Sequence, residues 1–195
     1  MKRSTISVGL LLLGSGFCAL VYQVAWLRLL RLIFGASTAS TAAVLAIFMA
    51  GLGLGGAVLG RVVERRPNAL RFYAHLEVGI ALLAAASPLL IAAARAAYLG
   101  LGGSPALGGG ATAVRLLLAA LILGLPTTLM GGTLPAAARA VEGADDRGRR
   151  ATAWLYGLNT LGGVLGAVLT TFVLLELLGI RQTLYLAAAI NLLVA

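Results

Sequence analysis

The chain has 195 residues, of which 61% are hydrophobic and 11% are charged, and its formal net charge is +9. Soluble domains contain about 45–50% apolar and about 25% charged residues, so this composition excludes a soluble globular protein. The positive charge does not indicate nucleic-acid binding, because most arginines fall at the ends of apolar segments, where they meet lipid headgroups. The sequence predicts an all-α, polytopic membrane protein in contact with the lipid bilayer.

About 20 largely apolar residues form a helix that crosses a bilayer. By this rule the chain is a single transmembrane domain of six helices, expected near residues 6–33, 38–60, 69–98, 112–140, 151–177 and 182–195. The first segment has no A-x-A-like cleavage site, so we interpret it as a retained helix and not a signal peptide. The sixth is short and still apolar at Ala195, which leads us to expect that the native protein continues beyond this residue.

The distribution of lysine and arginine predicts the orientation of these helices. The N-terminus and the loops after the second and fourth segments hold ten such residues, which are Lys2, Arg3, Arg61, Arg65, Arg66, Arg71, Arg139, Arg147, Arg149 and Arg150. The other side holds five, which are Arg28, Arg31, Arg95, Arg115 and Arg181. The richer side is cytoplasmic by the positive-inside rule, so both termini are expected in the cytoplasm. The glycine-rich connection 101–110 is expected to be a flexible loop on the other side.

The first segment carries an aromatic and polar motif at Tyr22, Gln23 and Trp26. At the α-helical rise, Gln23 lies about 26 Å from the start of the segment, near the outer surface. Aromatic side chains gather at this depth. We therefore expect Tyr22 and Trp26 to be interfacial anchors and Gln23 to form one interhelical hydrogen bond. All three are candidates for contact with a substrate or ion.

Glu77 lies inside the third segment, about 12 Å from its start. A carboxyl group at this depth is costly unless it is protonated, paired or facing a polar cavity. Asn159 lies at similar depth in the fifth segment, so a hydrogen bond between the two side chains is expected. Two interpretations stay open: Glu77 binds a proton or cation, or it forms a structural polar contact.

Two prolines interrupt the fourth segment. Pro126 and Pro135 are expected to kink the helix and to free backbone carbonyl groups. Thr127, Thr128 and Thr133 stand where they can bond within the broken region. We expect this region to line any cavity, with Thr127 and Thr128 as candidate binding residues.

Glycines recur at helical spacing in the second and fifth segments, at Gly51, Gly55, Gly56, Gly60, Gly162 and Gly166. Small residues at this spacing allow helices to pack closely in lipid. The sequences at 54–60 and 161–166 also resemble each other at an offset of about 107 residues, which spans three helices. An odd number of spans between two copies inverts the second copy. The sequence therefore predicts a 3+3 inverted repeat, as in each half of the major facilitator fold.

Catalytic and metal-binding motifs are absent from the sequence. His75 is the single histidine and Cys18 the single cysteine, which is too few for a metal site. No nucleophile elbow, phosphate loop or dinucleotide fingerprint is present. We expect no enzymatic activity, no cofactor and no nucleic-acid partner for this chain.

Five motifs together resemble the membrane region of fused spermidine-synthase-like proteins, and they lie at 15–28, 51–61, 73–79, 125–135 and 155–163. These are bacterial multi-pass proteins in which a major-facilitator-like region precedes a cytosolic aminopropyltransferase-type domain. This chain lacks that catalytic domain, and Gln23 stands where the family often has an acid. The resemblance implies a domain in the bacterial inner membrane that serves as platform and conduit for a polyamine or related small cation, next to a cytosolic synthase-like domain.

Two other functions stay open from the sequence. One is a structural or assembly subunit that binds other membrane subunits through its glycine-rich helix faces. The other is a stand-alone half-transporter that forms a homodimer.

Overall fold

The structure is a computed structural model, and it describes residues 3–34, 38–100, 102, 110–141 and 150–195. Its long elements are α1 (Arg3–Phe34), α2 (Thr38–Glu64), α3 (Ala69–Gly100), α5 (Ala111–Val141), α6 (Arg150–Leu169) and α8 (Gly179–Val194). A π-helical turn η2 (Thr170–Leu174) and a single turn α7 (Leu175–Leu177) join α6 to α8. The prediction of an all-α fold is confirmed.

Five helical stretches are long and apolar enough to cross a membrane: Thr5–Arg31, Thr41–Glu64, Ala69–Gly100, Ala111–Val141 and Arg150–Leu177. The last of these joins α6, η2 and α7. The remaining helix, α8, has 16 residues, a length of about 24 Å against a hydrocarbon core of about 30 Å. These lengths and compositions are those of a multi-pass membrane protein. Lys2, Arg147, Arg149 and most of the loop 101–110, which bear on the predicted orientation, lie outside the described residues.

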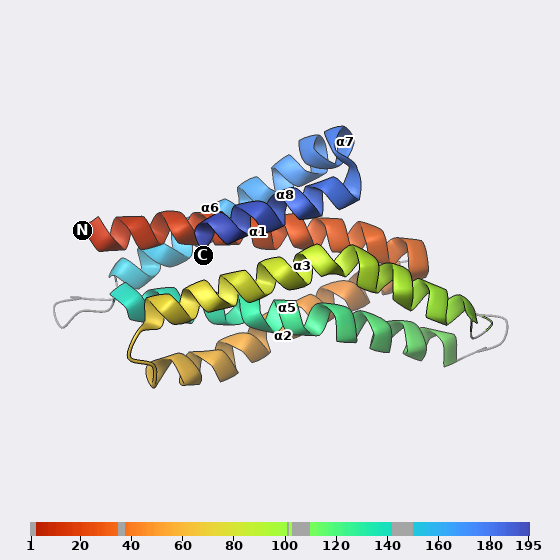
Figure 1. Cartoon of the computed structure of the whole chain (residues 1–195), viewed down its shortest axis with the longest axis horizontal. Coiled ribbons are helices and arrows are strands. Elements are labelled where there is room, and N and C mark those ends of the chain that lie inside the picture. The colour runs from red at the N-terminus through yellow and green to blue at the C-terminus, as the bar shows by residue number, and fades with distance from the viewer. Residues whose placement is uncertain (1–2, 35–37, 101, 103–109, 142–149) are drawn as a thin grey trace.

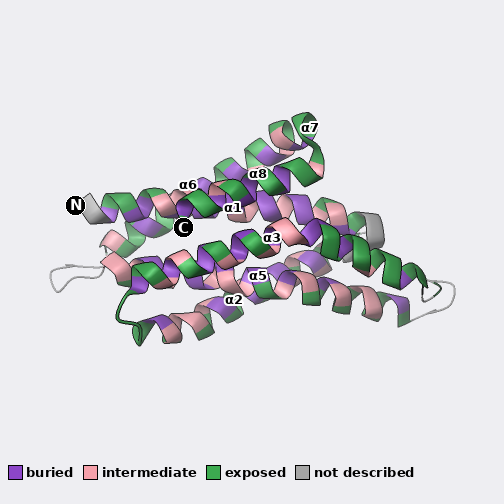
Figure 2. Cartoon of the chain, viewed as in Figure 1, coloured by how far each residue is buried: buried purple, intermediate pink, exposed green. Residues whose placement is uncertain are grey.

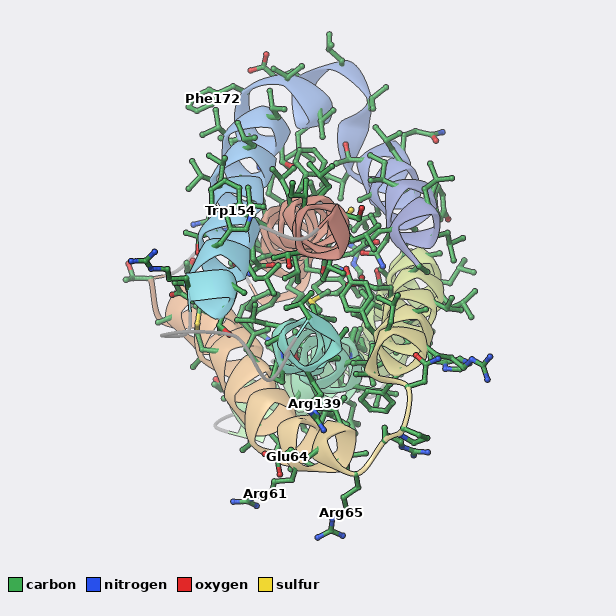
Figure 3. All side chains as sticks on the ribbon, turned by 90° about the vertical axis from the view of Figure 1, so that its left-hand side faces the viewer. Arg61, Glu64, Arg65, Arg139, Trp154 and Phe172 are labelled. Carbon is green, nitrogen blue, oxygen red and sulfur yellow. The ribbon has the colours of Figure 1, made fainter. Side chains whose placement is uncertain are left out.

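The helices form one elongated bundle (Figure 1). Viewed end-on in Figure 3, α1 and α5 occupy the centre, and α2, α3, α6 and α8 surround them. The most extensive contacts pair α2 with α5 and α1 with α6, followed by α3 with α5. The helix α8 packs mainly against α1 and α3. Each half of the chain therefore packs mainly against the other half.

Burial follows the faces of the helices: buried residues lie on the sides that face other helices, and exposed residues lie on the outward sides (Figure 2). The outward faces are apolar: Trp154 is 46% exposed and Phe172 67% exposed. Phe172 projects away from the bundle in Figure 3, and the charged residues Arg61, Glu64 and Arg65 lie at the end of α2. An apolar exterior with charges at helix ends is typical of a protein surrounded by lipid.

Candidate functional site

Glu77 lies in the first third of α3, and its side chain is completely buried. Asn191 of α8 is 1% exposed and meets it from the other half of the chain. The Asn191 amide donates hydrogen bonds from Nδ2 to Glu77 Oε2 and to the Glu77 backbone oxygen, each at 2.8 Å. One amide thus serves both the side chain and the main chain of Glu77, and it ties α8 to α3.

Further polar groups lie around this carboxyl group. The hydroxyl groups of Ser15 on α1 and Tyr73 on α3 lie beside it, and Tyr22 on α1 is within electrostatic range. Three buried atoms nevertheless have no hydrogen-bond partner of good geometry, namely Glu77 Oε1, Tyr73 Oη and Tyr22 Oη. Buried polar atoms in folded proteins normally find a partner. The Glu77 carboxyl group thus lies among the Ser15 and Tyr73 hydroxyl groups, and the nearby Tyr22 hydroxyl group has no hydrogen-bond partner.

The helices around Glu77 are joined in pairs by buried hydrogen bonds. Cys18 Sγ donates to the Ala187 oxygen at 3.4 Å and so joins α1 to α8. Trp26 Nε1 donates to Ser87 Oγ at 2.8 Å and so joins α1 to α3. With the Asn191–Glu77 bond, each pair among α1, α3 and α8 has one such link. Directional bonds of this kind fix the rotation of each helix, which apolar packing alone specifies less strictly.

The bond from Trp26 also compensates for a proline. Pro88 has no N–H to donate, so the Ala84 carbonyl group loses its helical partner. Ser87 Oγ donates to the Ala84 oxygen at 2.6 Å and accepts from Trp26 in turn. The kinked part of α3 is therefore stabilised from α1.

Trp26→Phe is expected to lower the free energy of unfolding by about 1 kcal/mol, the usual worth of one hydrogen bond. The reason is that Ser87 loses its donor from α1 while it keeps its bond to Ala84. Titration of the purified protein with sodium dodecyl sulfate, followed by circular dichroism, measures the change. The matched control is Trp154→Phe on the exposed face of α6, which should stay within about 0.5 kcal/mol of the wild type.

The positions of Tyr22 and Trp26 differ from the sequence-based expectation of interfacial anchors. Both side chains are 0% exposed, and their rings stack with centroids 5.5 Å apart and an interplanar angle of 19°. Depth along a helix does not say which side faces the bundle, and both rings lie on the side of α1 that faces the core. Gln23 next to them is half-buried, and within the described residues it forms no interhelical hydrogen bond.

The expected partner of Glu77 also differs, because Asn191 and not Asn159 bonds to it. Asn159 lies on α6 against α1, where its Oδ1 would be 2.9 Å from a Cβ built on Gly16. Asn191, Tyr73 and Ser15 were not singled out from the sequence. The sequence could have indicated Asn191, because a polar amide in an otherwise apolar helix is expected to face the interior of the bundle.

Thr127 and Thr128 use their hydroxyl groups within α5. Thr127 Oγ1 donates to the Leu123 oxygen at 2.7 Å, and Thr128 Oγ1 donates to the Gly124 oxygen at 2.7 Å. Thr127 is completely buried and packs against Gly51 of α2. Thr127 therefore fills part of the contact between α2 and α5.

Glycines bring two pairs of helices into backbone contact. Between α2 and α5, a Cβ on Gly55 would collide with the Thr128 oxygen, and one on Gly51 with the Thr127 side chain. Between α1 and α6, a Cβ on Gly162 would collide with the Leu13 oxygen, and one on Gly166 with the Phe17 oxygen. At Gly56 and Gly60, in contrast, the nearest atoms would be 3.6 and 3.8 Å away, which is ordinary contact.

The described residues contain no group of three or more His, Cys, Asp or Glu side chains that could hold a metal ion. Comparison of the chain with models of known protein families, with curated proteins and with solved structures finds no match.

Proposed function

We propose that the chain is a membrane domain that binds and conducts a polyamine or a related small cation, with Glu77 as the binding group. One observation carries this proposal: Glu77 is completely buried, and its carboxyl group lies among the polar side chains of Asn191, Ser15 and Tyr73. A carboxyl group inside a membrane is expensive and usually marks a path for ions or substrates. An ammonium group carries a positive charge and N–H donors, which complement the carboxyl group of Glu77.

The surrounding side chains suit such a guest. The Tyr22 hydroxyl group has no hydrogen-bond partner and can accept an N–H donor, and the Tyr73 hydroxyl group lies beside Glu77. The stacked rings of Tyr22 and Trp26 add aromatic surface, which attracts organic cations through the ring quadrupole. Asn191 positions the carboxyl group by holding one of its oxygens. The resemblance to spermidine-synthase-like proteins selects polyamines among small cations.

Matching contacts in the two halves of the chain support an inverted repeat. Gly55 contacts the Thr128 oxygen, and Gly162 contacts the Leu13 oxygen. The two glycines are 107 residues apart, the offset of the repeated glycine pattern, and their contact residues are 115 apart. With these shifts, α1 corresponds to α5 and α2 corresponds to α6. The contact between α2 and α5 therefore has the same register as the contact between α6 and α1.

Three further contacts follow the same shifts. Gly131 meets the Leu52 oxygen as Gly16 meets the Asn159 oxygen. A Cβ on Gly56 would lie 3.6 Å from the Gly131 oxygen, and one on Gly163 would lie 3.7 Å from the Gly16 oxygen. In the third contact, Gly79 of α3 lies against Leu129 of α5, and Gly14 of α1 lies against Val194 of α8. The glycine is on α3 in the first half, and the large residue is at the corresponding position on α8 in the second half. This last contact relates α3 to α8.

In such a repeat, Glu77 would lie at the junction of the two halves. The 115-residue shift that relates Gly79 to Val194 relates Glu77 to Leu192, the neighbour of the Asn191 to which Glu77 bonds. Two helices that are counterparts and contact each other, as α3 and α8 do, lie near the two-fold axis of such a repeat. In inverted-repeat transporters the substrate site lies at the repeat interface near the middle of the membrane, which is the position that Glu77 would occupy.

An assembly role through the glycine-rich faces has less support. Gly51, Gly55, Gly162 and Gly166 are in contact with other helices of the same chain. These positions are therefore already used within the bundle.

The proposal is tested in proteoliposomes that contain the purified full chain, with radiolabelled putrescine and spermidine as probes. Glu77→Gln keeps the size of the side chain and an oxygen for Asn191 but cannot carry a negative charge. We expect it to lower uptake at least tenfold. Glu176→Gln, which removes an exposed carboxylate at α7, should retain wild-type uptake. Equal uptake of both probes by the wild type and Glu77→Gln would overturn the proposal.

A further inference from the structure

A groove of about 280 Å³ opens between α1, α3 and α8, where α1 and α3 end and α8 begins. Most of its lining is apolar and comes from Leu29, Pro88, Ile91, Ala92, Ala96 and Leu99. Two arginines, Arg95 of α3 and Arg181 of α8, complete it. The groove therefore combines an apolar wall with two positive charges.

The backbone of α3 and α8 produces this groove. Beyond its middle, which contains Pro88, α3 runs away from the end of α8 that follows α7 (Figure 1). The turn into α8 passes through Gly179, whose φ of +71° is in the left-handed region that favours glycine. This turn precedes Arg181, which lines the groove together with Arg95. The groove thus depends on two backbone features that are far apart in the sequence.

The two arginines have no partner among the described residues, because neither forms a hydrogen bond or ion pair with them. Two other arginines at this end have partners: Arg31 donates to Thr41 Oγ1 at 3.1 Å, and Arg115 donates to Tyr98 Oη at 2.7 Å. Arg181 also stands in the first turn of α8, where the helix dipole disfavours a positive charge. An anion between the two guanidinium groups would offset both costs.

We infer that the groove binds an anionic phospholipid, with the phosphate between Arg95 and Arg181 and an acyl chain along the apolar wall. Guanidinium groups recognise phosphate oxygens with paired N–H donors. The wall formed by Leu29, Ile91 and Leu99 has no polar group to offer and suits a hydrocarbon chain. This site is separate from Glu77, so it does not depend on the proposed cation site.

Native mass spectrometry of the full chain tests the inference, after delipidation and addition of equal amounts of phosphatidylglycerol and phosphatidylcholine. The wild type is expected to retain phosphatidylglycerol at least fivefold more than phosphatidylcholine. The double variant Arg95→Ala/Arg181→Ala should lose this preference. The matched control is Arg65→Ala/Arg71→Ala, which removes the same charge at the opposite end of α3 and should keep it. Loss of the preference in both double variants, or its absence in the wild type, would overturn the inference.

A second variant separates the acyl chain from the headgroup. Ala96→Leu fills the groove without changing charge, and it is expected to lower phosphatidylglycerol retention at least threefold. An excess of inorganic phosphate should leave retention by the wild type unchanged. Full displacement by phosphate, or full retention in Ala96→Leu, would show recognition of phosphate alone and would contradict a lipid site. Circular dichroism of each variant shows whether the helical fold is retained.

Discussion

Gly55→Ala is expected to destabilise the protein by about 2–3 kcal/mol, whereas Gly53→Ala two residues away should leave it as stable or make it slightly more stable. A Cβ on Gly55 would collide with the Thr128 oxygen and lie 3.0 Å from the Gly131 Cα. These are backbone atoms of α5, so α2 and α5 would have to separate, and overpacking of this kind costs about 1–3 kcal/mol. Gly53 has no neighbour within 4 Å, and alanine favours helix by up to about 1 kcal/mol over glycine.

The first of these substitutions has a counterpart in the other half of the chain. Gly162→Ala would place a Cβ against the Leu13 oxygen, and Gly157 has no neighbour within 4 Å. If the halves are repeats, Gly162→Ala should reproduce the result of Gly55→Ala within about 1 kcal/mol, and Gly157→Ala, a control with open space around it and not the counterpart of Gly53, should leave the stability nearly unchanged. Unfolding in sodium dodecyl sulfate, followed by circular dichroism, measures all four variants. A destabilisation by Gly53→Ala as large as that by Gly55→Ala would mean that close packing of α2 on α5 is not the cause.

Hydrophobicity accounts for most of what the sequence predicted about the fold. Because backbone groups in lipid have to bond within their own helix, long apolar segments can form little else. The segment expected at 69–98 is the helix Ala69–Gly100, and the one expected at 151–177 lies in the stretch Arg150–Leu177. Apolar content does not fix local hydrogen bonding, so the π-helical turn at Thr170–Leu174 was not foreseen.

The candidate site was predicted only in part, because its contacts depend on tertiary packing. The burial of Glu77 follows from the cost of a carboxyl group in lipid. Its partner does not follow, since Asn159 and Asn191 both stand in apolar helices and only the packing of α8 on α3 selects Asn191. Tyr22 was placed by its distance along α1. That distance does not reveal the rotation of the helix, which turned its ring into the core.

Asn191→Leu is expected to lower the free energy of unfolding by about 2–3 kcal/mol. The substitution leaves Glu77 Oε2 without its donor in the bundle interior, and a buried polar group that loses its partner costs about 1–3 kcal/mol, or more when it is charged. Glu77→Leu should cost a similar amount because it leaves the Asn191 amide with one bond, to the backbone. The double variant Glu77→Leu/Asn191→Leu should be closer to the wild type than the sum of the single variants, since apolar residues at both positions leave no unpaired side chain.

The expected coupling energy is about 1–2 kcal/mol, at the upper end of the range for interhelical hydrogen bonds in membranes. Additive single effects would show that the two side chains do not interact.

The double variant also separates the two interpretations of Glu77 that the sequence left open. A cation site requires its negative charge, so a folded double variant should fail to take up putrescine or spermidine. A structural contact requires only a stable bundle, so uptake by the folded double variant would assign Glu77 to stability alone.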